Sequence, residues 1–321
     1  MKIAVVGASG FIGRHLVDRL LSEGHEIAAL LRSESAARAF REKKIKAIPG
    51  NVADKDAIEH TIDGSDVVVN LARAKAHGAA PRREVDTVNI EGARLVARAA
   101  MKAGARLIHA SSTAVYGSRL GELPASEHTP PATDSIYALS KLHGEAAVRS
   151  EHSRAIILRI SAVLGPRADS WLSLFRSARN GTLRSVGDGS NLHHPVDVED
   201  VVNAIGLAIG CSSNAARIYN VAGPAPITMR QLAELMGNRD RQQRFRSAPP
   251  LAAQMWIAGG RALEKVGIHL PKFESVLFLN GNRAFDLSLA RRELAFEPRI
   301  DIAASVARTA RYFESNGLLQ P

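Results

Sequence analysis

The sequence contains a single cysteine, Cys211, among its 321 residues. One cysteine cannot form an intrachain disulfide, which excludes a disulfide-stapled secreted domain and leads us to expect a reducing, cytoplasmic compartment. Long apolar runs are also absent: the longest, such as residues 201–210, have about ten residues, too few for a membrane-spanning helix. No signal peptide is expected, because a glycine turn and then charged residues follow the first short apolar run. We therefore predict a chain without a membrane span.

Aromatic residues are scarce as well, at 5% of the chain, while Lys and Arg outnumber Asp and Glu by 42 to 32, a formal net charge of +10. The positive charge is scattered and few rings are available to stack on bases, so no nucleic-acid partner is predicted. Hydrophobic residues at 45% and charged residues at 23% exclude a disordered, collagen-like or coiled-coil chain. The length allows one large domain or two small ones.

A glycine-rich turn lies between the first predicted strand and the first predicted helix. Residues 2–6 are a short apolar run typical of a buried parallel strand, and apolar residues recur at helical spacing after the turn. Gly7 permits the tight turn, Gly10 allows the backbone to approach a pyrophosphate, and Gly13 lets the helix pack on the strand. A second strand follows at 26–31. We therefore predict a dinucleotide-binding βαβ unit, with contacts from Gly7, Ser9, Gly10, Phe11, Ile12 and Gly13.

The end of the second strand indicates which dinucleotide binds. A carboxylate there would bind the ribose 2′-hydroxyl of NAD, whereas an arginine accommodates the 2′-phosphate of NADP. The sequence has Arg32 and Ser33 at this point and no carboxylate. A guanidinium can form a forked pair with phosphate oxygens, and a hydroxyl adds a donor. NADP is therefore favoured over NAD, and a solvated arginine in a loop is the alternative interpretation.

Short apolar strands and helical patterns alternate through the first half of the chain. Further strands are predicted at 45–48, 66–71, 106–111 and 154–160, separated by helices at 54–62, 84–103 and 136–151. This alternation predicts an α/β protein with an open, doubly wound parallel sheet, the Rossmann fold.

Beyond about residue 165 the regular alternation ends and proline and glycine become frequent. We predict a dinucleotide-binding domain at 1–165 and a smaller C-terminal substrate-binding lobe at 166–321, interleaved with the last elements of the sheet. Ligands on such sheets bind at the C-terminal ends of the strands. Four residues at those ends join the predicted cofactor contacts: Asn51, Val52, Leu71 and Ala72.

Tyr137 and Lys141 are the candidate catalytic pair. Their spacing places them one turn apart on the same face of the helix predicted at 136–151. A free tyrosine, with a pKa near 10, is a poor base at neutral pH, but a neighbouring ammonium favours the phenolate. Such a tyrosine can take a proton from a substrate hydroxyl or give one to a carbonyl. A hydroxyl in the segment 111–117, after another strand, can hold the reacting oxygen toward the tyrosine.

Together these residues resemble the extended short-chain dehydrogenase/reductase family, in its NAD(P)-dependent epimerase/dehydratase branch, over nearly the whole chain. The motifs that carry the resemblance lie, in chain order, at 7–13, 70–72, 89–92, 111–117, 137 with 141, 158–159, 165–166, 187–189, 196–201, 219–221 and 290–294.

The resemblance implies a role for each catalytic candidate. Tyr137 is then the acid/base, Lys141 supports it and binds the nicotinamide ribose, and Ser112 is the orienting hydroxyl, with Thr113 as the fallback. Both Tyr137 and Lys141 also count as cofactor contacts. Members of the family are commonly homodimers joined through two helices per subunit, here the helices predicted at 84–103 and 136–151, so a homodimer is expected.

Two positions depart from the nucleotide-sugar members of that family. Those members usually carry an asparagine and an arginine that hold the nucleotide diphosphate, where this chain has Ala162 and His193. Their loss removes the amide and guanidinium donors that a diphosphate prefers. His193 and His194 either replace those donors in part or lie in a loop, and the loop is favoured. No carboxylate or cysteine has metal-ligand spacing to this pair, so no metal site is predicted.

The C-terminal lobe suggests an apolar substrate. The segment 171–181 resembles members that reduce ketones or oxidise secondary alcohols. The apolar segment 251–257 either lines a substrate pocket, contacts a membrane surface or forms ordinary helix core, and helix core is favoured. The arginine-rich run at 239–246 is interpreted as a solvated loop.

Three functions remain open. The favoured one is an NAD(P)-dependent oxidoreductase that transfers a hydride between nicotinamide and a hydroxyl or carbonyl of a small or apolar molecule, with NADP preferred. The second is a nucleotide-sugar epimerase or dehydratase, in which the hydride leaves and returns. The third is a non-catalytic cofactor sensor or scaffold, because a fold does not by itself determine function.

Overall fold

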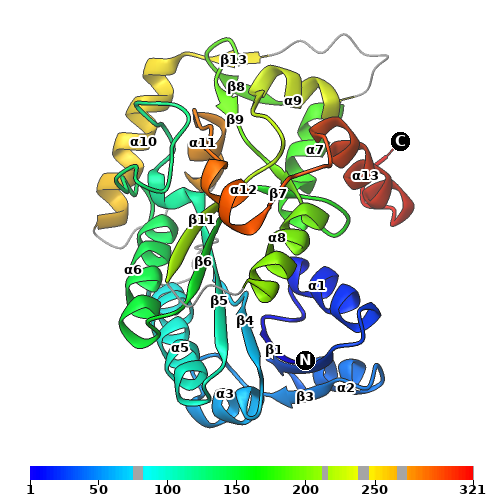
Figure 1. Cartoon of the computed structure of the whole chain (residues 1–321). Coiled ribbons are helices and arrows are strands. Elements are labelled where there is room, and N and C mark those ends of the chain that lie inside the picture. The colour runs from blue at the N-terminus through cyan, green and yellow to red at the C-terminus, as the bar shows by residue number, and fades with distance from the viewer. Residues whose placement is uncertain (75–81, 212–215, 238–245, 266–272, 321) are drawn as a thin grey trace.

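The computed structural model describes residues 1–74, 82–211, 216–237, 246–265 and 273–320, and in this part of the chain one parallel sheet organises the molecule (Figure 1). Its seven strands are hydrogen-bonded in the order β11-β6-β5-β4-β1-β2-β3, and every pairing is parallel. The strands are β1 (Lys2–Val6), β2 (Glu26–Leu31), β3 (Lys46–Pro49), β4 (Val67–Asn70), β5 (Arg106–Ser112), β6 (Ile156–Ile160) and β11 (Arg217–Val221). The strand order reverses between β1 and β4, which is where ligands bind in such sheets.

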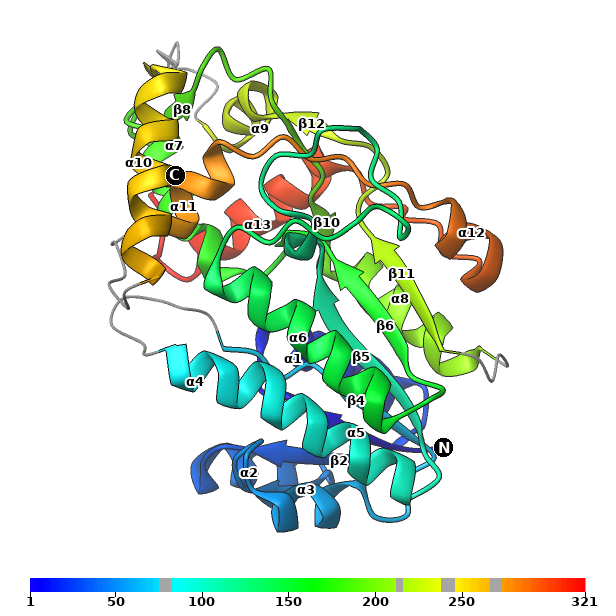
Figure 2. The same cartoon turned by 90° about the vertical axis from the view of Figure 1, so that its left-hand side faces the viewer.

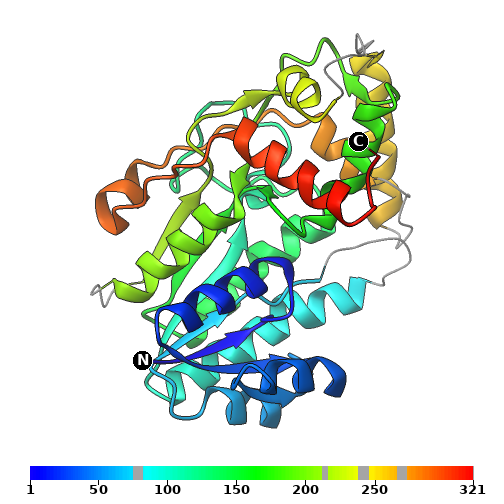
Figure 3. The same cartoon turned by 90° about the vertical axis from the view of Figure 1, so that its right-hand side faces the viewer.

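Helices cover both faces of the sheet. Figure 2 shows one face and Figure 3 the other. One apolar core joins the sheet to α1 (Phe11–Ser22), α2 (Glu34–Arg41), α8 (Val198–Gly210) and α12 (Ser288–Leu294). The core on the other face joins it to α3 (Lys55–Ile62), α5 (Gly92–Lys102) and α6 (Ile136–Glu151). The predicted doubly wound Rossmann fold is confirmed. Central strands such as β4 are buried throughout, because helices exclude water from both sides.

Two helical elements differ from the sequence-based expectation. Helix α2 was not predicted, because its eight residues include three arginine or glutamate side chains that weaken its apolar pattern. The helix predicted at 84–103 begins earlier, as α4 (Arg82–Asp86), and continues through a π-helical turn (Thr87–Glu91) into α5. Gly144 of α6 lies against this turn, and a Cβ atom there would overlap the carbonyl oxygen of Asn89. Strand ends differ from the predicted ones by one or two residues, as is usual at element boundaries.

The remaining C-terminal elements form a lobe above the C-terminal edge of the sheet (Figure 1). A third apolar core joins α7 (Leu172–Arg179), α9 (Met229–Met236) and α13 (Ile302–Ser315). Short strand pairs link the lobe: β7 (Val163–Leu164) with β10 (Val196–Asp197), β9 (Leu192–His193) with β12 (Ile227–Thr228), and β8 (Arg184–Val186) with β13 (Arg246–Ala248). Helices α10 (Pro250–Lys265) and α11 (Phe273–Leu279) complete it. Most of the run expected to be a solvated loop, residues 239–245, lies outside the described residues.

None of the helices described is both long enough and apolar enough to cross a bilayer.

Candidate active site

The glycine turn brings the loops after β1 and β4 into contact. Gly7 has a φ of +90°, and a Cβ atom on it would lie 2.8 Å from the carbonyl carbon of Leu71. A Cβ atom on Gly13 would overlap the carbonyl oxygen of Gly7. Helix α1 starts after Gly10, whose extended backbone has no side chain to cap it, so no capping side chain occupies the first amides of α1. A helix N-terminus of this kind binds phosphate through its amides and its dipole.

The other predicted cofactor contacts lie at the same C-terminal edge. Ser9, Phe11 and Ile12 flank the turn, Arg32 and Ser33 follow β2, Asn51 and Val52 follow β3, and Leu71 and Ala72 follow β4. Their local structure differs in whether the side chain is available to a ligand.

Arg32 is exposed and has no ion-pair partner among the described residues. Ser33 accepts the amide of Ala36 at 3.2 Å and so caps helix α2, and its hydroxyl lies 3.1 Å from that of Ser35. Asn51 accepts the amide of Ala53 in a tight turn. Val52, in contrast, is buried against Gly92 of α5, so its side chain is part of the core and only its backbone is available to a ligand.

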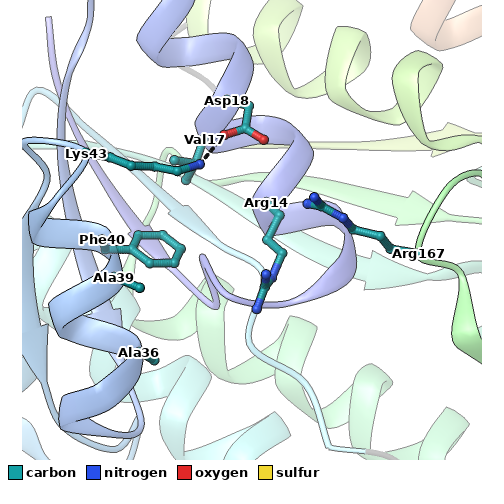
Figure 4. Close-up of a pocket in the computed structure, with 8 residues that line it drawn as sticks. All are labelled: Arg14, Val17, Asp18, Ala36, Ala39, Phe40, Lys43 and Arg167. Atoms are coloured by element: carbon teal, nitrogen blue, oxygen red, sulfur yellow. Dashed lines mark hydrogen bonds and ion pairs between the residues drawn. The ribbon is translucent and has the colours of Figure 1, made fainter. Parts of the chain in front are cut away.

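A cavity of about 150 Å³ lies between α1 and α2 (Figure 4). Its lining residues are Arg14, Val17, Asp18, Ala36, Ala39, Phe40, Lys43 and Arg167. Lys43 is paired with Asp18 at 2.8 Å, and the Nε atom of Arg14 donates to the carbonyl of Ser9. The volume is below the range of about 300–1,000 Å³ that is typical of ligand pockets. None of the candidate catalytic residues lines this cavity.

Lys141 is anchored to the sheet. Its side chain is buried, and Nζ donates to the carbonyl oxygen of Ala110 on β5 at 2.6 Å. Burial lowers the pKa of Lys141 to about 8, against the opposing charge of Glu145 one turn further along α6. The ammonium form is therefore still populated at neutral pH and is lost as pH rises through about 8.

The Lys141 anchor aligns Tyr137 with Ser112. Helix α6 runs back along the sheet against the direction of β5 (Figure 2). Along α6, Tyr137 lies four residues from Lys141 toward the C-terminal edge of the sheet, an axial distance of about 6 Å. Along β5, Ser112 lies two residues from Ala110 in the same direction, a distance of about 6 to 7 Å. Both residues are therefore displaced from the anchor by a similar distance toward the C-terminal edge of the sheet. Tyr137 is half-buried there.

Three neighbouring hydroxyl side chains lie at the end of β5 and directly after it, and they differ in burial and in hydrogen bonding. Ser111 is buried and donates to the Oε1 atom of Glu145 at 2.5 Å, so its proton is engaged. Thr113 is buried in the turn Thr113–Tyr116. Ser112 is half-buried and accepts the amide of Ala114 at 3.2 Å, which orients its oxygen and leaves its proton free to donate. Ser112 therefore fits the orienting role better than its neighbours do.

Behind these residues lies a buried ion pair. Glu145 and Arg159 of β6 pair at 2.8 Å and 3.0 Å through two guanidinium nitrogens, and their side chains are 4% and 5% exposed. A third nitrogen of Arg159 donates to the hydroxyl of Tyr116, which donates in turn to Asn220 of β11 at 2.8 Å. The network thus joins α6 to three strands below the catalytic edge.

Asn89 positions the chain that follows β4, a role that sequence reasoning did not assign. The side chain forms two hydrogen bonds with the backbone of Ala74, each 2.9 Å, and donates to the hydroxyl of Ser140 on α6. Asn89 is buried within the π-helical turn. Asn89 belongs to the motif at 89–92, which carries the family resemblance. The π-helical geometry that directs its amide cannot be predicted from a sequence pattern.

The loop expected for the two histidines holds for His194, which lies between β9 and β10, and is wrong for His193; both rings are buried. His193 ends β9, is buried, and its ring lies 4.7 Å from that of Phe278. His194 is buried and bonds to the carbonyl of Gly223 and the amide of Phe285. Burial lowers the pKa of His193 to about 3 and that of His194 to about 4. Both rings are therefore neutral and provide no cation for a diphosphate. Among the described residues, no three metal-ligating side chains come together.

A model of the family described as "NAD dependent epimerase/dehydratase family" matches residues 3–222. The chain belongs to this family. It is thereby an NAD(P)-dependent enzyme of the short-chain dehydrogenase/reductase type.

Relatives within the family differ in chemistry. The chain is 31% identical over 201 residues to a ceramide reductase from Caulobacter vibrioides, a match covering 62% of this chain and 57% of that protein. It is 28% identical to a UDP-glucose 4-epimerase from Mycolicibacterium smegmatis, covering 98% and 99% of the two chains. The crystal structure of a dTDP-glucose 4,6-dehydratase from Streptomyces venezuelae with NAD bound superposes with a TM-score of 0.76 at 24% identity, over 100% of this chain and 99% of that one. That structural likeness supports the fold.

Proposed function

We propose that this family member is an NADP-dependent oxidoreductase that interconverts a carbonyl and a secondary alcohol on a small or apolar molecule. When bound, the nicotinamide supplies or accepts the hydride. In the reductive direction, Tyr137 donates its phenolic proton to the carbonyl oxygen, Ser112 donates a hydrogen bond that holds this oxygen, and the ammonium of Lys141 favours the phenolate that remains. Oxidation reverses each transfer.

The buried position of His193 is the observation that supports a substrate without a nucleotide diphosphate. A nucleotide diphosphate needs cationic or amide donors directed into the site. His193 is instead buried, neutral and packed on Phe278. Ala162 packs with the apolar core of the C-terminal lobe. The two positions that would hold the diphosphate thus offer a buried, neutral ring and a methyl group, which favours a substrate without a diphosphate, and the similarity to a ceramide reductase is consistent with this.

A nucleotide-sugar epimerase or dehydratase is the second candidate. It is supported by the full-length similarity to a UDP-glucose 4-epimerase. In that chemistry the hydride returns to the sugar, so the dinucleotide is not consumed.

Stoichiometry of dinucleotide use separates the two candidates. We expect NADPH to be oxidised in equal amount to product when the enzyme is given apolar ketones such as decan-2-one, and we expect no saturable heat of binding when UDP is titrated into it. Conversion of UDP-glucose without net dinucleotide consumption, together with saturable UDP binding, would instead support the second candidate and refute the first.

Arg32 is proposed to select NADP. We expect Arg32→Asp to lower the ratio of kcat/KM for NADPH to that for NADH by roughly 10- to 100-fold, because a charge-assisted hydrogen bond to phosphate contributes about 1.5–3 kcal/mol. Initial rates with both dinucleotides provide the measurement. Arg38→Asp is the matched control, since it makes the same charge change on an exposed residue of α2. A wild-type preference for NADH, or an equal effect of the two variants, would contradict the role of Arg32.

A further inference from the structure

Helix α10 exposes large apolar side chains to solvent. Leu251 and Met255 lie one turn apart and are 68% and 69% exposed, and Trp256, whose ring lies 5.7 Å from that of Phe273, is still 36% exposed. These three are half of the six large apolar side chains exposed in the described part of the chain. Scattered exposed apolar residues are ordinary, whereas a group of them marks an interaction surface. The favoured interpretation of 251–257 as helix core is therefore wrong for this face.

The opposite face of α10 already has its partner. Ile257 packs with Phe273 and Leu277 of α11 in a small apolar core. Gly260 makes room for the ring of Phe273, since a Cβ atom there would meet the ring at 2.5 Å or closer. Because α11 occupies this side, α10 cannot bury its exposed face by rotating about its axis.

Charged residues are distributed unevenly along the sequence of α10 and its flanking segments. The twelve residues 249–260 include no charged side chain. The sequence 239–246 ahead of them contains four arginines and one aspartate, and Arg261 follows directly. In sequence, an uncharged stretch with leucine and tryptophan that is flanked by arginines is typical of helices that lie in the interface of an anionic bilayer. The formal net charge of +10 attracts the chain to the same surface.

We propose that Leu251, Met255 and Trp256 of α10 dock this protein on the surface of an anionic lipid bilayer. The two most exposed side chains enter the boundary between headgroups and acyl chains, and the indole lies at headgroup level, where tryptophan is enriched. Attachment is peripheral. It goes beyond the proposed oxidoreductase function and does not depend on it, because binding to lipid needs neither substrate nor dinucleotide.

An ion pair connects helix α10 to the segment that precedes α6. Arg261, on the last turns of α10, pairs with Asp134 at 3.2 Å, and the same carboxylate oxygen accepts the amide of Ser118 at 2.6 Å. Asp134 lies just ahead of α6, the helix that carries Tyr137. A bilayer held by α10 therefore lies near the start of α6.

Cosedimentation with vesicles tests the proposal. The full-length protein is mixed with vesicles of phosphatidylcholine alone or with 30% phosphatidylglycerol, in low and in 0.5 M salt. We expect binding to the anionic vesicles at low salt, several-fold weaker binding in high salt because screening shortens the reach of charge, and little binding to phosphatidylcholine. Replacing both apolar tips, as L251Q with M255Q, is expected to lower the partition coefficient at least tenfold.

Met101→Gln is the matched control, because Met101 is 43% exposed on α5, outside the proposed face. Circular dichroism and thermal unfolding establish that each variant is folded. Equal vesicle binding by the double variant and the wild type overturns the proposal, as does binding that is insensitive to phosphatidylglycerol. A change in sedimentation coefficient of the double variant without lipid assigns the face to a second copy of the chain, and this too overturns it. Ketone reduction measured without lipid distinguishes failure of this proposal from failure of the proposed function.

Discussion

Replacing Tyr137 by phenylalanine is expected to lower kcat for carbonyl reduction by about 10² to 10⁴-fold, the usual contribution of a positioned acid/base. The substitution removes only the phenolic oxygen. Tyr137 is half-buried, and its hydroxyl has no hydrogen-bond partner among the described residues, so the fold loses little. The dissociation constant for NADPH, measured by fluorescence titration, should change by no more than a few fold.

Tyr312→Phe is the matched control for this prediction. Tyr312 is half-buried on α13 beside Phe313, in the lobe core and away from α6. Its loss of a hydroxyl should leave kcat unchanged. If Tyr137→Phe retained full turnover, Tyr137 would not be the proton donor. If neither wild type nor variant turned over any carbonyl while both bound NADPH, the non-catalytic sensor would be the better description.

Replacing Arg159 by methionine is expected to lower the free energy of unfolding by about 3–5 kcal/mol, because it leaves the buried carboxylate of Glu145 without its cation. The substitution also removes a hydrogen bond to Tyr116, whose hydroxyl connects to Asn220. Urea unfolding followed by circular dichroism measures the loss. Glu145→Gln should have a similar effect for the reverse reason, since it leaves a buried guanidinium uncompensated.

An exposed pair provides the comparison. Arg98 bonds to Glu151 at 2.8 Å and 3.0 Å, a geometry close to that of the buried pair, but the Arg98 side chain is 57% exposed. Arg98→Gln should lower the free energy of unfolding by about 1 kcal/mol or less. The double variant of Glu145→Gln with Arg159→Met should recover part of the loss, since it leaves no unpaired charge. Equal effects of Arg159→Met and Arg98→Gln would show that burial adds nothing to the pair.

Local spacing was sufficient to predict the sheet, the glycine turn and the catalytic pair. Gly7, Gly10 and Gly13 lie within one turn and one helix start, so their conformational demands can be deduced from neighbours in sequence. Tyr137 and Lys141 share a helix face because of the helical repeat alone. The parallel sheet follows from the alternation of short apolar strands with helices, since a crossover must cover each face.

Other features depend on contacts between distant segments. Glu145 and Arg159 come together because α6 packs on β6, and nothing near either residue in the sequence indicates its partner. The π-helical turn that aims Asn89 depends on the close approach of Gly144 from another helix. Whether His193 would replace a diphosphate donor in part or lie in a loop was open in the sequence; in the structure it ends β9, is buried, and packs on Phe278.

Helix α10 also combines a feature that the sequence predicts with one that depends on tertiary packing. Its sequence determined that residues 251–257 are apolar and helical, but apolar residues are found both in cores and at interaction surfaces. The tertiary structure decided between these, because α11 covers the side of Ile257 and leaves Leu251 and Met255 in solvent. By itself, then, the sequence determined this protein's family, through motifs that occur in order along the chain, and its sheet, through the alternation of short strands and helices. It also predicted which residues would contact the dinucleotide. Only the tertiary structure decided which side chains are desolvated, paired or exposed, because burial depends on which distant segments pack together.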